Sequence, residues 1–214
     1  MSICLLGVLE GAAGAAGPGA HWRFDELTGT TAEDSAGDHD GTSTDVATGL
    51  PRHVGTAYGF NGASSVVRVP STDDLNPGTA NFSFGAAVNF ATVPPASTWD
   101  VVRKGLSGTK GGYYKLELFD GGTKNGARAR CYFRGANGNS KSAGGGRQLD
   151  DGRWHTVTCS RTGGKVTITV DGRTSSNSFS LGKLTNTAEI TIGAKPTGGD
   201  AYLGLLDEVG LTFP

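Results

Sequence analysis

Acidic side chains are the first residues of this chain that could do chemistry, because a glycoside hydrolase needs two carboxylates facing one cleft, about 5 to 9.5 Å apart. A run of the form E-x-D-x-x-E would place such groups on one face of a strand, and the sequence has no such run. Glu117 is the only acidic residue of its predicted strand, and the neighbours Asp207 and Glu208 are expected to point to opposite faces. A hydrolase or lyase would need unusual positions, such as Glu117, Asp100 and His155.

Histidine and serine give no stronger indication of catalysis. None of the four histidines stands in an H-x-H or H-E-x-x-H metal-binding spacing. His155 follows Trp154, so we expect the two side chains to face opposite surfaces. No serine lies in the G-x-S-x-G turn that exposes a nucleophile. We therefore expect a protein that is not an enzyme.

Aromatic residues near loops or strand ends could instead bind a sugar, because a flat ring stacks on the apolar face of a pyranose. The candidates for such a ligand-binding platform are Trp99, Tyr113, Tyr132 and Tyr202. The alternative is that these rings pack in the core or at strand edges.

The elements that carry these residues read as short strands. Residues 150–172 spell a hairpin, in which apolar and polar residues alternate on both sides of a Gly163-Gly164 turn. Strict alternation also predicts a strand at residues 82–90, and Asn61-Gly62 predicts a second hairpin. Further strands are expected at residues 21–26, 57–60, 65–69, 99–104, 113–119, 127–134, 189–192 and 203–213, with a break at Pro94-Pro95 and loops at 29–41 and 135–146. This spacing predicts an all-β sandwich.

The two later cysteines lie in predicted strands. Cys131 belongs to residues 127–134 and Cys159 to residues 154–161, and a glycine-rich loop joins these two strands. Antiparallel pairing can bring the cysteines opposite each other, so we predict a disulfide that contributes about 3 kcal/mol. The alternative is two buried free thiols.

Composition excludes several classes of partner. The 214 residues suffice for one sandwich domain, and the 36 glycines suit many tight turns. With 19 basic and 20 acidic residues, the formal net charge is −1, so we expect no nucleic-acid partner. No apolar run reaches the roughly 20 residues of a membrane-spanning helix.

We expect residues 1–20 to be a leader and residues 21–214 to form the domain. The leader is either a secretory signal with Ala13-Gly14-Ala15 as its cleavage site, or a disordered or mis-started segment.

Six segments, taken in order, resemble the laminin G-like branch of the concanavalin A-like lectin/glucanase superfamily. They are residues 21–37 (HWRFDELTGTTAEDSAG), 60–70 (FNGASSVVRVP), 82–84 (FSF), 102–105 (VRKG), the hairpin 150–172 and 204–209 (GLLDEV). The chain departs from the family pattern where the usual tryptophan of the third segment is replaced at or near Val88. The resemblance implies a two-sheet antiparallel jelly roll, in which Trp154 is a buried anchor of the core.

The resemblance also implies a possible cofactor and a set of functions. In jelly-roll glucanases, an Asp-Glu near the first strand and an Asp in the last often hold a structural calcium ion, and Asp25, Glu26 and Asp207 match them. The resemblance implies a secreted bacterial protein, acting as a non-catalytic recognition or structural module that binds a glycan or a protein surface. Two alternatives stay open: a hydrolase or lyase acting on a polysaccharide, and a structural subunit of a larger secreted or phage-like assembly.

Overall fold

Antiparallel pairing organises the strands into two sheets, which the computed structural model describes for residues 17–52, 54–93, 98–122 and 126–213. Sheet A contains, in order across the sheet, β14 (Arg173–Ser178), β13 (Lys165–Val170), β12 (His155–Thr162), β7 (Phe82–Asn89), β16 (Leu203–Phe213), β5 (Thr56–Asn61) and β4 (Ala47–Pro51), with β1 (Gly17–Trp22) also paired to β16. Sheet B contains β11 (Ser140–Gly145), β10 (Ala127–Gly135), β9 (Gly112–Asp120), β8 (Thr98–Lys104), β15 (Ile190–Ile192), β6 (Val66–Val69), β3 (Gly41–Thr44) and β2 (Thr31–Ala32). A short 3-10 helix, η1 (Asp73–Leu75), follows β6.

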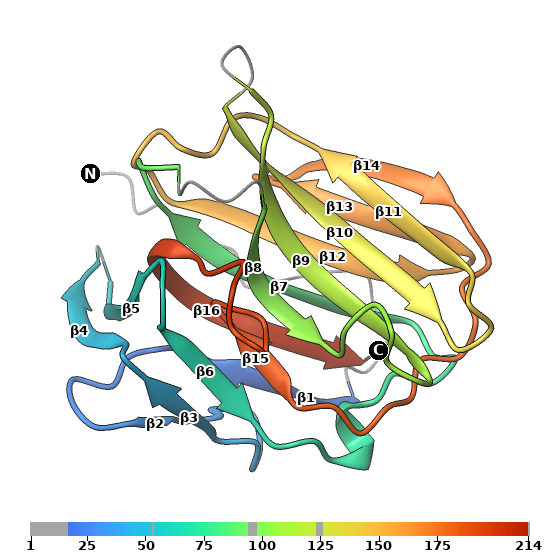
Figure 1. Ribbon diagram of the computed structural model, residues 1–214, viewed down its shortest axis with the longest axis horizontal. Helices are drawn as coiled ribbons and strands as arrows, with labels where there is room; N and C mark the ends of the chain where they lie inside the picture. The colour runs from blue at the N-terminus through green and yellow to red at the C-terminus, as the bar shows by residue number, and fades with distance from the viewer. Residues whose placement is uncertain (1–16, 53, 94–97, 123–125, 214) are drawn as a thin grey trace, which may run out of the picture.

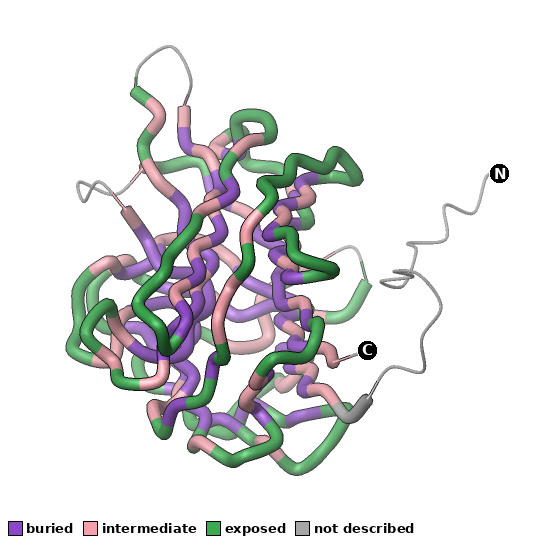
Figure 2. Tube along the Cα trace, turned by 90° about the vertical axis from the view of Figure 1, so that its right-hand side faces the viewer, coloured by how far each residue is buried: buried purple, intermediate pink, exposed green. Residues whose placement is uncertain are grey.

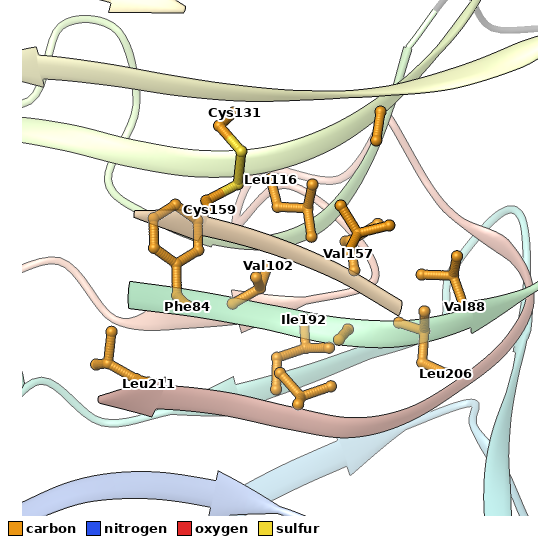
Figure 3. Packing of buried hydrophobic residues seen from close by; sticks show 14 of the residues in the cluster. Phe84, Val88, Val102, Leu116, Cys131, Val157, Cys159, Ile192, Leu206 and Leu211 are labelled. Atoms are coloured by element: carbon orange, nitrogen blue, oxygen red, sulfur yellow. A yellow bond between two sulfur atoms is a disulfide. The ribbon is translucent and has the colours of Figure 1, made fainter. Parts of the chain in front are cut away.

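The two sheets pack face to face, with sheet B in front of sheet A in Figure 1. Buried residues gather along the strands, while the connecting loops are exposed (Figure 2). The alternation of β7 places Phe82, Phe84, Ala86 and Val88 in the core, as predicted. Phe84 and Val157 of sheet A point toward Val102 and Leu116 of sheet B (Figure 3). The predicted antiparallel jelly-roll sandwich is therefore confirmed.

Hairpin 150–172 forms as β12 and β13. Thr162 pairs with Lys165, and the turn residues Gly163 and Gly164 have positive φ angles of 53° and 75°. Two successive positive φ angles match the twist of a two-residue hairpin turn and favour glycine at both positions. The turn and the alternation were both read correctly from the sequence.

The face of β12 that points into the core is the opposite of the expected one. His155, Val157 and Cys159 are buried, whereas Trp154 precedes the strand and is only half-buried. The guanidinium of Arg52 lies 4.6 Å from the centre of the Trp154 ring. The predictions that Trp154 anchors the core and that His155 faces the other surface are therefore wrong.

Two predicted connections also differ. Asn61-Gly62 does not close a hairpin, because β5 pairs within sheet A and β6 within sheet B. The segment instead crosses between the sheets, and the Asn61 side-chain oxygen accepts hydrogen bonds from three successive backbone N–H groups of residues 63–65. The predicted loop 135–146 contains β11, which pairs with β10 from Arg134↔Ser140 to Ala129↔Gly145.

The structure contains the predicted disulfide between Cys131 and Cys159, but in a different setting. Cys131 lies on β10 of sheet B and Cys159 on β12 of sheet A, with their Cα atoms 5.5 Å apart. The bond therefore joins the two sheets through the core (Figure 3), rather than two paired strands.

The first strand begins inside the predicted leader. Gly17 starts β1, and Ala20 pairs with Leu211 and is buried, so the last residues of the segment 1–20 belong to the sandwich. The remainder of that segment, with Ala13-Gly14-Ala15, lies outside the described residues, as does Pro94-Pro95. Within the part of the chain that the structure describes, no helix is long and apolar enough to cross a membrane.

Candidate functional site

The outward surface of three neighbouring strands of sheet B carries many charged and aromatic side chains. We call it the β8–β10 face and define it by the outward residues of β8, β9 and β10: Thr98, Asp100, Arg103, Tyr113, Lys115, Glu117, Phe119, Arg128, Arg130, Tyr132 and Arg134. The inward residues between them, such as Leu116, Leu118 and Cys131, are fully buried in the core. Alternation along the strands therefore gathers these polar groups on one surface.

Two carboxylates lie opposite each other at the middle of this face. Asp100 on β8 pairs with Glu117 on β9, and a β-bulge between Asp100 and Val102 follows. The ammonium of Lys115 contacts both carboxylates, at 3.3 Å from Asp100 Oδ1 and closer to Glu117. Register between the two strands therefore joins acids that lie 17 positions apart in the sequence.

Each carboxylate also has an arginine partner. The Arg103 guanidinium pairs with Asp100, and Arg130 Nε donates a hydrogen bond of 2.6 Å to Glu117 Oε1. Burial raises the pKa of the Asp100 carboxyl, and the positive charges of Arg103 and Lys115 oppose that rise. The result is a network in which buried acids hold basic side chains in fixed positions.

A hollow of about 320 Å³ opens at one end of the network. Its lining consists of Arg103, Leu106, Ser107, Tyr113, Lys115, Lys195, Thr197 and Asp200. The rings of Tyr113 and Tyr132 stack beside it, with their centres 5.3 Å apart and their planes 15° from parallel. Burial raises the pKa of the Tyr113 hydroxyl, so this group stays a neutral hydrogen-bond donor. An aromatic ring can contact the apolar face of a sugar, and the hydrogen-bonding groups around it can bind the sugar hydroxyls.

The four aromatic candidates from the sequence separate into two groups. Tyr113 and Tyr132 both belong to the β8–β10 face, where Tyr132 is half-buried and Tyr113 is 6% exposed. Trp99 and Tyr202 are each only 1% exposed and pack in the core, so their predicted role in ligand binding is wrong. Trp99 points inward by the alternation of β8, whereas Tyr202 lies just before β16 and packs edge-on against the rings of Phe60 and Phe90.

The carboxylates predicted to bind calcium have separate partners. Asp207 is buried and pairs with Arg52, the Asp25 carboxylate accepts the backbone N–H of Thr56 at 2.9 Å, and the Glu26 carboxylate accepts the backbone N–H of residue 33 at 2.8 Å. Among the described residues, no group of three or more His, Cys, Asp or Glu side chains lies close enough to hold a metal ion. The structural calcium ion stays a prediction.

The regular alternation expected at Asp207 and Glu208 is interrupted, although Asp207 is buried and Glu208 is exposed. A β-bulge between Asp207 and Gly210, with Glu208 at a positive φ of 49°, interrupts the alternation of β16. Asp207 pairs with Arg52, and the negative charge of Glu208 also acts on Arg52.

Two histidines form ion-paired clusters that tie loops to the sandwich. His155 lies between Asp171, at 2.8 Å from Nδ1, and Asp151, at 2.9 Å from Nε2. His39 lies between Asp34 and Asp74, with both N···O distances 3.0 Å. Both ring nitrogens of each histidine therefore face a carboxylate, which favours a structural role over catalysis. His53 lies outside the described residues.

Stability is expected to depend on pH through His39. Hydrogen bonds to Asp34 and Asp74 raise its pKa above the usual 6.5, against the effect of burial. A histidine whose folded-state pKa is raised contributes stability that is fully present below its unfolded pKa and is lost as pH rises through the folded pKa. In thermal melts between about pH 5.5 and pH 9, the melting temperature of wild type should exceed that of H39Q at the acidic end. The difference between the two melting temperatures should shrink as pH rises. A gap that stays constant over that range would contradict this expectation.

The β8–β10 face also contains residues that sequence reasoning missed. Arg103, Lys115, Arg130 and Arg134 were not recognised as part of a site. The alternating run A-R-A-R-C-Y-F-R of residues 127–134 nevertheless places two of them, Arg130 and Arg134, on one face together with Arg128. The pairing of Asp100 with Glu117 had no such local signal, because it depends on the register of β8 against β9.

Comparisons with known proteins agree with this architecture. A laminin G family model, described as "Concanavalin A-like lectin/glucanases superfamily", matches residues 61–211. No curated protein matches the chain in sequence.

Solved structures show the same fold at low sequence identity. Domains LG4-5 of the mouse laminin alpha1 chain are 18% identical, with a TM-score of 0.52 over 77% of this chain and 44% of that one. The binding domain of botulinum neurotoxin serotype D is 11% identical, with a TM-score of 0.65 over 91% of this chain and 47% of that one. The chain thus spans less than half the length of these two structures.

Domain 4 of AbnA, a GH43 extracellular arabinanase from Geobacillus stearothermophilus solved with arabinotriose, is comparable to this chain in length. It is 20% identical, with a TM-score of 0.60 over 91% of both chains. Likeness at this level concerns the fold, whereas the family model covers most of the sequence. The chain belongs to the concanavalin A-like lectin/glucanases superfamily, in its laminin G branch.

Proposed function

We propose that the chain is a non-catalytic, secreted module that recognises a glycan through the β8–β10 face. The observation that carries this proposal is the half-buried ring of Tyr132, which stacks on the buried Tyr113 beside a polar hollow of about 320 Å³. An aromatic face can hold the apolar side of a sugar ring, while the surrounding polar groups bind its hydroxyls. The arabinotriose complex of the AbnA domain supports a glycan over a protein surface as the ligand.

The network beneath the hollow favours binding over catalysis. Asp100 is fully buried and Glu117 is 2% exposed, and each is held by a basic partner. A general acid must reach the leaving oxygen at hydrogen-bond distance, and a nucleophile must reach the sugar carbon. Two carboxylates that are covered and ion-paired do neither, so we expect them to position the arginines and the lysine above them.

The disulfide supports the extracellular setting. Disulfides persist in oxidising compartments and are rare in reducing ones. A buried bond between Cys131 and Cys159 across the sandwich fits a protein that folds after secretion.

Removing one ring of the pair tests the binding site. We expect Tyr132→Ala to weaken binding of the preferred polysaccharide by about tenfold, which corresponds to about 1.4 kcal/mol. Affinity electrophoresis against a polysaccharide panel, followed by titration calorimetry on the best ligand, measures the change. Trp154→Ala is the matched control, because Trp154 is also a half-buried aromatic residue but lies against Arg52, which pairs with a sheet A carboxylate. Equal losses in both variants, or no loss in Tyr132→Ala, would remove the β8–β10 face as the site.

The enzymatic alternative has a direct test with the same panel. Assays for reducing ends and for unsaturated products should remain at background level for wild type. Product formation that disappears in Glu117→Gln would instead establish a polysaccharide-cleaving enzyme, with Asp100 and Glu117 as its carboxylates.

A further inference from the structure

The charges of the β8–β10 face differ from those of the protein as a whole. Its outward residues include five basic side chains and two acidic ones: Arg103, Lys115, Arg128, Arg130 and Arg134 against Asp100 and Glu117. The complete chain has a formal net charge of −1. Basic groups are therefore concentrated on the surface that carries the tyrosine pair.

The acidic side chains of this face are also more deeply buried than some of its basic side chains. The side chains of Asp100 and Glu117 are 0% and 2% exposed, whereas the Arg130 side chain is 37% exposed. Glu117 pairs with the partly exposed Arg130, whereas Arg103, the partner of Asp100, is itself only 3% exposed. A ligand approaching from solvent therefore meets the Arg130 guanidinium before the carboxylates, and Glu117 keeps that guanidinium in place.

The basic groups continue to the rim of the hollow. Arg134 lies directly opposite Tyr113 on the neighbouring strand, and its Nη1 donates to the backbone oxygen of Ser107, which lines the hollow, at 3.0 Å. On the other side, Lys195 lines the hollow and pairs with Asp200 at 2.7 Å. The tyrosine pair therefore lies next to positive groups with well-defined positions.

We propose that the ligand of this face is an acidic glycan, whose sugar rings carry carboxylate groups. The inference rests on the proposed function and names the class of glycan. A guanidinium fork matches a carboxylate with two parallel hydrogen bonds, and its positive charge strengthens both. A uronic acid stacked on the half-buried ring of Tyr132 would place its carboxylate within reach of this basic rim, where Arg134 lies on the same strand, opposite Tyr113.

The experiment compares matched ligands that differ only in charge. Acidic polysaccharides such as polygalacturonate and alginate are titrated beside their methyl-esterified or carboxyl-reduced forms, in low and in moderate salt. We expect the acidic forms to bind at least about tenfold more tightly, and their affinity to fall as salt screens the charges. Sulfated and neutral polysaccharides complete the panel.

Charge-matched variants locate the interaction. R134Q combined with K195Q should weaken binding of the acidic form about tenfold and leave the esterified form unchanged. K165Q combined with R173Q removes the same net charge from exposed positions on β13 and β14 of sheet A. This control variant should bind the acidic and the esterified polysaccharide as wild type does. Thermal melts of both double variants establish that they are folded.

The outcomes distinguish this inference from the proposal on which it rests. Equal binding of the acidic and esterified forms, lost in Tyr132→Ala, overturns the acidic ligand but keeps glycan recognition. Binding only to neutral or only to sulfated polysaccharides also overturns the carboxylate-bearing ligand and keeps glycan recognition. Absence of binding to the entire panel overturns both.

Discussion

Replacing Trp22 with alanine is expected to lower the free energy of unfolding by about 3 to 5 kcal/mol. Trp22 is 0% exposed, and its indole N–H donates to the backbone oxygen of His39 at 2.8 Å. The substitution removes a large buried ring and also leaves the His39 carbonyl without its donor. Urea unfolding, followed by fluorescence and circular dichroism, measures the loss.

Trp154→Ala is the informative partner of this experiment. Trp154 is half-buried and contacts the Arg52 guanidinium, so its removal should cost only about 1 kcal/mol or less. If the two variants lose similar stability, then Trp154 packs in the core after all and β12 presents the other face. Unchanged m-values are needed for the comparison, because they show that both variants unfold from equally compact states.

The sequence predicted the alternation of β12 correctly, but the prediction of which face is buried was wrong. Val157 and Cys159 are apolar and Thr156 and Thr158 are polar, which favours the buried face that the structure has. His155 shares that buried face because Asp151 and Asp171 bind both of its ring nitrogens. Those carboxylates lie before the strand and after the hairpin, so alternation within the strand gives no sign of them.

Residues typical of tight turns predicted where the chain turns, but not which strands each turn connects. Asn61-Gly62 has the residues of a tight turn, and the chain does turn there. The strands on either side, however, enter opposite sheets, with Phe60 on one side of the core and Val67 on the other. Local backbone preference is the same for a hairpin and for a crossing between sheets, so only the packing of the entire core distinguishes them.

Weakly patterned strands were the hardest to predict. β11, with the sequence SKSAGG, has one buried apolar residue, Ala143, which lies opposite Cys131. Its formation depends on pairing with β10 rather than on its own composition, so it was read as a loop. The candidate site shows the same limit, because the arginines of β10 are visible in its alternation while the Asp100 and Glu117 pair depends on strand register.

Removing the disulfide should have an effect close to that of Trp22→Ala. Cys131 and Cys159 are 28 positions apart and join the two sheets, so the bond limits how far the unfolded chain can expand. Closing a loop of that length stabilises the folded state by about 3 to 4 kcal/mol in the chain-entropy description. The double variant Cys131→Ala with Cys159→Ala should lose that amount in urea unfolding at equilibrium.

Two comparisons separate the cross-link from the packing of the sulfur atoms. The double variant loses the bond and also leaves space at two fully buried positions, whereas wild type unfolded and refolded with a reductant loses only the bond. If the cross-link dominates, reduced wild type and the double variant should unfold at similar urea concentrations, both well below that of the oxidised protein. If reduced wild type matches oxidised wild type instead, the two sheets hold together by packing alone and the bond contributes little to stability.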